Sequence, residues 1–141
     1  MSRFILIISL FLVSNCFGQD NNSSIYYSNN GIEIYVKPID CLEPSKGTEI
    51  QYLMIEIRNT NSYNVKVSFD KEIWYDNTCQ TCNSVSNEYK TLIEVNKNSS
   101  VEGSCDDTDK NLRIFSKMLN LDKVRKLTKY ELKNIKIENI K

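Results

Sequence analysis

The chain has 141 residues, with 18 basic and 18 acidic side chains and no histidine. The lack of histidine excludes Ser-His-Asp and Cys-His catalytic triads, HExxH zinc sites, and copper or haem sites with a histidine ligand. With only 4 glycines and 2 prolines, the composition is typical of a globular protein, and nothing in it implies a cofactor.

The first 18 residues have the layout of a secretory signal peptide. A short basic start precedes an apolar run over residues 4–13, and Cys16-Phe17-Gly18 forms a small-x-small site. We therefore expect cleavage between Gly18 and Gln19. The apolar run is too short to remain as a permanent membrane helix, so no transmembrane segment is expected in the mature chain.

This leader predicts an exported protein, in the periplasm or outside the cell. A lipoprotein anchored through Cys16 is the alternative, although Asn15 stands where the bacterial lipobox has Gly, Ala or Ser. Residues 19–110 carry 8 basic and 15 acidic side chains, whereas residues 111–141 carry 9 and 3. In an exported protein this basic end indicates a solvated, lysine-rich strand edge, so we expect no nucleic-acid partner.

The mature chain is long enough for one domain, which we place at residues 31–141 after a flexible polar segment at 19–30. Asn30-Gly31 predicts a turn, and apolar residues then alternate with polar ones. The alternation predicts strands at 32–38, 49–59, 63–75, 89–95, 101–105, 112–118 and 129–140.

Three positions qualify this strand pattern. Trp74, the only tryptophan, is expected to fill the core. A change of phase near Asn134 indicates a β-bulge. Apolar residues at spacing three leave open a short helical turn near 116–126. The predicted fold is all-β, a single antiparallel immunoglobulin-like β-sandwich of about six to eight strands, with a small barrel as the alternative.

Four cysteines follow the leader, at positions 41, 79, 82 and 105. An even number in a small exported domain predicts two disulfides, with three possible pairings. If the strands run up and down in turn, all four cysteines meet at one pole of the sandwich. This arrangement slightly favours Cys79–Cys82 within its loop and Cys41–Cys105 across the pole.

Cys79 and Cys82 form a CxxC motif, which also allows a thiol–disulfide exchange function. Redox motifs of this kind normally lie at a helix N-terminus, but Asp76 and Asn77 precede this one and no helix follows closely. Four converging thiolates could instead bind zinc, although only one CxxC pair is present.

Other polar clusters give weaker signals. Asp107, Asp109 and Asn111 have the alternate spacing of a calcium loop, but Leu112 replaces the required glycine. Carboxylates for glycoside hydrolysis could come from Glu33, Glu56 or Glu72, and no pair stands out. The tyrosines could line a binding surface or the edge of the core; they are Tyr26, Tyr27, Tyr35, Tyr52, Tyr63, Tyr75, Tyr89 and Tyr130.

Several segments together resemble small exported proteins of flavobacteria and their relatives. The leader ends in Phe-Gly-Gln, and the other segments are Asn30-Gly31-Ile32-Glu33-Ile34, Cys79-x2-Cys82, Gly103-Ser104-Cys105, Leu112-Arg113-Ile114-Phe115 and Tyr130-Glu131-Leu132-Lys133-Asn134-Ile135. This resemblance implies an immunoglobulin-like sandwich in the periplasm or outside the cell, and it carries over no catalytic residue.

These observations predict a non-enzymatic, disulfide-stabilised binding or accessory module of the cell envelope. We expect its partner to be a protein or a glycan of the envelope or the cell exterior. The alternative function is an envelope thiol–disulfide protein that uses Cys79 and Cys82.

Overall fold

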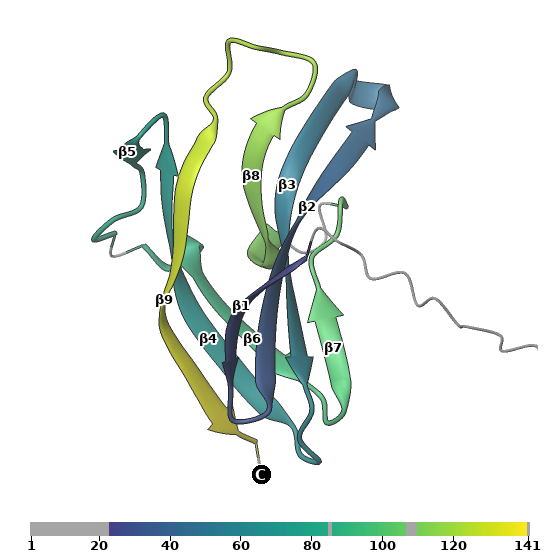
Figure 1. The fold of residues 1–141 in the computed structure, drawn as a ribbon, viewed down its shortest axis with the longest axis vertical. Coiled ribbons are helices and arrows are strands. Elements are labelled where there is room, and N and C mark those ends of the chain that lie inside the picture. Colours follow the sequence, from purple (N-terminus) through teal and green to yellow (C-terminus); the bar gives the residue numbers. More distant parts are fainter. Residues whose placement is uncertain (1–22, 85, 107–109, 141) are drawn as a thin grey trace, which may run out of the picture.

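The computed structural model describes residues 23–84, 86–106 and 110–140. In this part of the chain nine strands form two antiparallel sheets, and the predicted all-β sandwich is confirmed (Figure 1). The expected leader, with Cys16 and the Gly18–Gln19 cleavage site, lies outside the described residues. Sheet A contains β1 (Ser24–Asn29), β2 (Ile32–Glu43), β3 (Thr48–Asn59), β7 (Ser99–Glu102) and β8 (Arg113–Met118).

Sheet B is built around β4. It contains β4 (Val65–Tyr75), β5 (Thr78–Cys79), β6 (Lys90–Val95) and β9 (Leu127–Asn139). β9 pairs along one edge of β4, while β6 and then β5 share the other edge. Sheet A is arranged similarly, because β2 pairs along one edge of β3 and β7 and β8 share the other. Three short 3-10 helices occur in the connections, at Pro44–Lys46, Asn87–Tyr89 and Lys110–Leu112.

The core lies between the two sheets and follows from the alternation in sequence. Every second side chain of β4 is buried, from Val65 to Tyr75. The buried faces of β2 and β3 pack against it, and Leu112 inserts from the connection before β8. The buried side chains of this core are Ile32, Ile34, Val36, Ile55, Ile57, Val65, Val67, Phe69, Ile73, Tyr75, Val95, Leu112, Ile114 and Leu132.

Trp74 does not fill the core as expected, because the strict alternation of β4 points it outward. Its side chain is half-buried on the outer face of sheet B, with the Lys129 ammonium 4.4 Å from the ring centroid. The same alternation points Lys71 inward. Lys71 is 6% exposed, and its ammonium donates a hydrogen bond of 2.9 Å to the carbonyl of Asn111.

Within the segment expected to be flexible at 19–30, residues Ser24–Asn29 form the strand β1, while residues 19–22 lie outside the described residues. Asn30 and Gly31 have positive φ angles of 50° and 72°, which is the backbone conformation of a two-residue hairpin turn. β1 therefore pairs with β2. The Tyr26 hydroxyl also accepts a hydrogen bond of 2.8 Å from the Leu132 backbone, so β1 links the two sheets.

Two further expectations concern the last third of the chain. The predicted bulge is confirmed, since Asn134 has a φ of 53° and the pairing of β4 with β9 shifts register there. The helical turn considered near 116–126 does not form. Residues up to Met118 belong to β8, and the Leu119 N–H then donates to the carbonyl of Glu49. Pairing with β3 therefore replaces local helical bonding.

Gly103 marks the point where the chain leaves β7 and crosses to β8. Its N–H donates to the Ile55 carbonyl at 3.2 Å, which draws the backbone against β3. A Cβ atom at this position would collide with the backbone carbonyl of Leu112 and lie 3.2 Å from the Met54 sulfur. Only glycine therefore allows this crossing without displacement of the backbone.

We predict that Gly103→Ala lowers the free energy of unfolding by about 1–3 kcal/mol, because the added methyl group overpacks the crossing. Chemical denaturation of the exported protein measures this change. Ser104→Ala is the matched control and is expected to change the stability by less than about 0.5 kcal/mol. Equal stability of the two variants would contradict the packing argument.

Candidate functional site

The two disulfides join Cys41 to Cys105 and Cys79 to Cys82, with Cα–Cα distances of 5.5 and 5.8 Å. These are the bonds that the expected strand order favoured. Both bonds lie toward the expected end of the sandwich, where Met118 pairs near Cys41 and Leu127 pairs at the end of β4, but each bond belongs to a different sheet. Cys41 lies in β2 of sheet A, whereas Cys79 lies in β5 of sheet B.

The Cys41–Cys105 bond fastens the segment that follows β7 to the far half of β2. Cys41 is only 1% exposed. The Arg113 guanidinium reinforces the same segment, because its Nη1 atom donates to the carbonyls of Ser104, Cys105 and Asp106 at 3.1, 2.9 and 2.9 Å. This part of the structure therefore has a clear stabilising role.

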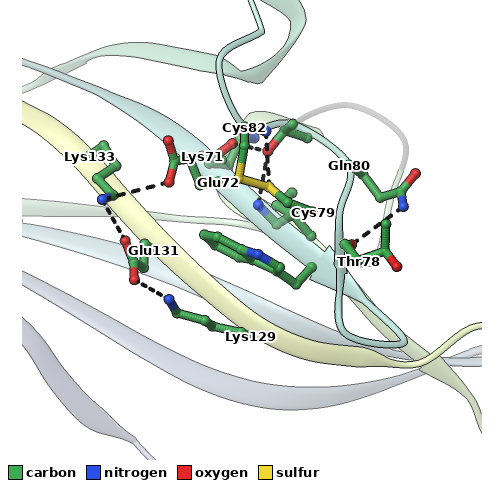
Figure 2. Close-up of a disulfide and its surroundings, with 12 residues drawn as sticks. Lys71, Glu72, Thr78, Cys79, Gln80, Cys82, Lys129, Glu131 and Lys133 are labelled. Carbon is green, nitrogen blue, oxygen red and sulfur yellow. Dashed lines mark hydrogen bonds and ion pairs between the residues drawn. A yellow bond between two sulfur atoms is a disulfide. The ribbon is translucent and has the colours of Figure 1, made fainter.

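The Cys79–Cys82 bond closes a loop beside the end of β4 (Figure 2). Cys79 pairs directly with Trp74 across the two strands. Between the cysteines, the Gln80 N–H donates to the Ile73 carbonyl at 2.8 Å. The loop thus continues along the edge of β4 beyond the point where β6 ends.

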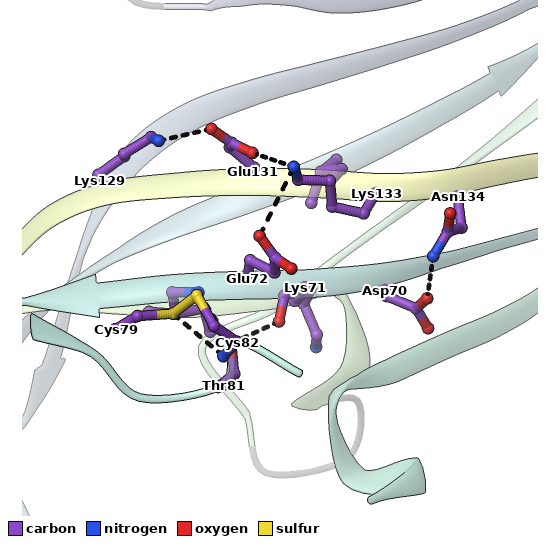
Figure 3. A network of polar contacts seen from close by, with 12 residues as sticks. Asp70, Lys71, Glu72, Cys79, Thr81, Cys82, Lys129, Glu131, Lys133 and Asn134 are labelled. Carbon is purple, nitrogen blue, oxygen red and sulfur yellow. Dashed lines mark hydrogen bonds and ion pairs between the residues drawn. A yellow bond between two sulfur atoms is a disulfide. The ribbon is translucent and has the colours of Figure 1, made fainter. Parts of the chain in front are cut away.

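Thr81 anchors this loop to β4 from within the motif (Figure 3). It is 5% exposed. Its hydroxyl donates to the Lys71 carbonyl at 2.8 Å and accepts from the Ile73 N–H at 2.9 Å. These bonds satisfy backbone groups of β4 that a neighbouring strand would otherwise pair. The CxxC loop therefore occupies the place of a neighbouring strand along this part of β4.

The geometry gives little support to the two other hypotheses for the cysteines, which are thiol–disulfide exchange and zinc binding. Cys79 lies in a two-residue strand, so it lacks the helix N-terminus that lowers the pKa of a redox thiol. Within residues 23–84, 86–106 and 110–140, no group of three or more cysteine, aspartate or glutamate residues could hold a metal ion. The calcium spacing involves Asp107 and Asp109, which lie outside the described residues.

The carboxylates and tyrosines that the sequence offered as candidate site residues lie in separate parts of the two sheets. Glu33 accepts a hydrogen bond from the Tyr35 hydroxyl, Glu56 is held by Arg58 at 2.6 Å, and Glu72 lies 3.7 Å from the Lys133 ammonium. The first two are in sheet A and the third is in sheet B. The contacting tyrosines also divide into separate groups, such as Tyr26 with Tyr130 and Tyr52 with Phe115.

A depression on the outer face of sheet B was not expected from the sequence. Because β9, β4 and β6 are in register, their outward side chains fall into rows. The small side chain of Ser68 lies in the middle of one row, between two longer side chains. The two central rows are Lys136–Ser68–Leu92 and Lys133–Asp70–Lys90.

The depression has a volume of about 710 Å³ and is open to solvent. This volume is within the range of ligand sites, about 300–1,000 Å³. A smaller hollow of about 200 Å³ continues it toward the CxxC loop and shares Asp70, Lys90 and Asn134 with it. The side chains that line the larger one include Ser68, Asp70, Lys90, Leu92, Asn134 and Lys136.

Asp70 and Asn134 form a hydrogen-bonded polar pair in the depression. The Asn134 amide donates a hydrogen bond of 2.7 Å to the Asp70 carboxylate (Figure 3). The bulge in β9 makes this contact possible, since Asn134 is the residue with positive φ. The pair presents a free carboxylate oxygen and an amide oxygen close together on a fixed backbone.

A ladder of ion pairs runs from β9 to the margin of the depression. Glu131 contacts the ammonium groups of Lys129 and Lys133 at 2.6 and 2.7 Å. The hydrogen bond from Lys129 has the largest effect on the Glu131 carboxyl and the one from Lys133 the next largest, and together they lower its pKa to about 2. The contact with Glu131 in turn raises the pKa of Lys133.

Comparison with known protein families, curated proteins and solved structures found no match for this chain. The resemblance to flavobacterial exported proteins therefore stays a prediction. Among the described residues, no helix has the length and apolar character needed to cross a membrane.

We predict that the two disulfides differ in their contribution to stability. The cysteines of the first bond are 64 positions apart and those of the second are 3 apart. On the chain-entropy model, Cys41→Ala/Cys105→Ala costs about 4 kcal/mol of unfolding free energy, and Cys79→Ala/Cys82→Ala costs about 2 kcal/mol. Chemical denaturation of both double variants provides the comparison. The reverse order of the two costs would contradict this assignment.

We predict that the Glu131 carboxyl titrates near pH 2 in the folded protein, below its ordinary value of 4.5. The ionised Glu131 carboxylate stabilises the folded state through its contacts with Lys129 and Lys133. Because its pKa is lower in the folded state than in the unfolded state, this stabilisation is present above about pH 4.5 and is lost as the pH falls toward 2. NMR titration of the side-chain carboxyl measures the midpoint. Lys129→Met is expected to raise that midpoint, whereas Lys117→Met on sheet A leaves it unchanged.

Proposed function

We propose that this chain is an exported, non-enzymatic binding module whose ligand is an oligosaccharide. The observation that carries the proposal is the solvent-open depression on the outer face of sheet B. Saccharides present hydroxyl groups that both donate and accept hydrogen bonds. The lining supplies acceptors at Asp70 and Asn134 and a donor at Lys90.

The depression also offers an apolar contact. Leu92 is 64% exposed and lies in the same row as Ser68. A pyranose ring has a face of C–H groups that can pack on such a side chain while its hydroxyl groups reach the polar residues. A rigid sheet supports these groups, and this reduces the entropy lost on binding.

The non-enzymatic role is supported by how the acidic side chains of this face are held. Asp70 accepts from an amide, and Glu72 and Glu131 are paired with lysine ammonium groups. At Glu131 the two lysine contacts lower the pKa and favour the ionised carboxylate, whereas glycoside hydrolysis needs one carboxylic acid with a raised pKa.

Export is supported by the two disulfides together with the leader pattern. We place the protein in the periplasm or outside the cell, with lipid anchoring through Cys16 as the alternative. An immunoglobulin-like type is supported by the strand order. If β2, β3, β4, β6, β8 and β9 correspond to strands A, B, C, C′, E and F, the sheets read A-B-E and F-C-C′.

Thiol–disulfide exchange is the other candidate, and its support is the spacing of Cys79 and Cys82. The anchored loop around Thr81 makes this function the weaker one. Exchange would require the loop to leave the edge of β4 and expose backbone groups that it now covers.

Ser68→Trp tests the proposal, because an indole at this position fills the floor of the depression. Wild-type protein is expected to bind at least one member of an oligosaccharide array, and Ser68→Trp is expected to lose that binding. Ser100→Trp, on the exposed side of β7 in sheet A, is the matched control and should bind as the wild type does. Unchanged binding by Ser68→Trp, or no binding by the wild type, would overturn the proposal.

A further inference from the structure

We infer that the ligand of this depression is an acidic saccharide, one whose sugar units carry carboxylate or sulfate groups. The inference rests on the proposed saccharide-binding function and specifies its ligand class. It follows from the lysines that surround the depression and from the partners that each of them has.

Three lysines stand around Asp70 and Ser68, but they are not equivalent. Lys133 already forms two ion pairs, since its ammonium lies 2.7 Å from Glu131 and 3.7 Å from Glu72. Within the part of the chain that the structure describes, neither Lys90 nor Lys136 takes part in an ion pair. Their ammonium groups are therefore not held in a salt bridge by any described carboxylate, and the nearest acidic partner in the pairing register is Asp70, opposite Lys90.

Lys90 and Lys136 stand on opposite walls of the depression. Lys90 pairs with Asp70 from the β6 side, and Lys136 pairs with Ser68 from the β9 side. A ligand lying over β4 therefore passes between two ammonium groups. A saccharide with negative charges on more than one unit can contact a positive group on each side of the strand.

The one carboxylate in the depression does not cancel this preference. The Asn134 amide donates a hydrogen bond of 2.7 Å to Asp70, which occupies one of its two carboxylate oxygens. The lining side chains then carry two ammonium groups against this single carboxylate. Lys136 belongs to the basic C-terminal segment, where residues 111–141 carry 9 basic and 3 acidic side chains, and Lys90 adds a positive charge from residues 19–110, which carry 15 acidic and 8 basic side chains.

A lysine-rich strand edge that only prevents aggregation would account for the position of each lysine on the sheet, because β9 and β6 are both outer strands of sheet B. It does not account for the lining of one depression by both Lys90 and Lys136. An acidic peptide would meet the same charges, but an open depression with amide and hydroxyl groups favours a chain of hydroxylated rings. The acidic peptide is therefore one outcome of the test.

The test compares ligands that differ only in charge. The probes are polygalacturonate with its methyl ester, dextran sulfate with dextran, and poly-glutamate. Isothermal titration of the exported protein gives the affinity for each. We expect the acidic member of at least one pair to bind roughly tenfold or more tightly than its neutral counterpart, as loss of a charge-assisted contact predicts.

Two matched variants assign the effect to this depression. Lys90→Met/Lys136→Met is expected to lose about tenfold or more of the affinity for the acidic saccharide. Lys97→Met/Lys123→Met removes the same charge at two exposed turn positions outside the depression and is expected to change the affinity by less than about twofold.

Each contrary result has a distinct meaning. Equal affinity for acidic and neutral saccharides, abolished by Ser68→Trp, overturns the acidic preference and leaves the proposed function standing. Binding of poly-glutamate alone overturns the saccharide class and indicates an acidic peptide. Binding of none of these probes counts against both proposals. Equal losses in the two lysine variants would show non-specific charge attraction and overturn the site.

Discussion

β4 is hydrogen-bonded along both edges, and the arrangement of sheet B depends on this pairing. A strand that is held on both sides cannot rotate about its axis, so its alternate side chains must face the core and the solvent. Phe69 and Ile73 complete the core for this reason, while Ser68 and Asp70 form the floor of the depression. The same backbone therefore determines the stability of the domain and the chemistry of its outer face.

The two edges of β4 are held by different means. β9 provides a regular partner with one bulge, whereas the other edge is divided between β6 and the CxxC loop. The short disulfide and the Thr81 hydroxyl make this loop a fixed element instead of a mobile turn. The CxxC motif, which by spacing alone suggests redox chemistry, is thereby explained by the needs of a strand edge.

The bulge in β9 links the fold to the candidate site. The extra residue gives Asn134 a left-handed backbone conformation and brings its amide to Asp70. Lys133 on the preceding position is directed to Glu131 and Glu72 instead. One local irregularity thus separates a lysine that serves an ion-pair ladder from side chains that stay available to a ligand.

Local patterns in the chain predicted the strands, the bulge and the antiparallel sandwich. They failed where residue type was given more weight than position in the pattern. The size of Trp74 predicts a core position, yet alternation from Val65 points Trp74 outward and Lys71 inward. The polar composition of the segment before Asn30-Gly31 does not predict a strand. The structure has one there because the turn sets the register in which β1 pairs with β2.

Elements that depend on neighbouring residues are predictable from the chain, because alternation, turns and bulges are properties of short segments. The site is not predictable in this way, because it depends on the pairing of distant strands. Lys136, Ser68 and Leu92 come from three strands and meet only through their pairing register, and a shift of one residue would point them to the other face. The lengths of contacts such as Asn134 with Asp70 depend on the same long-range pairing, so no local pattern contains them.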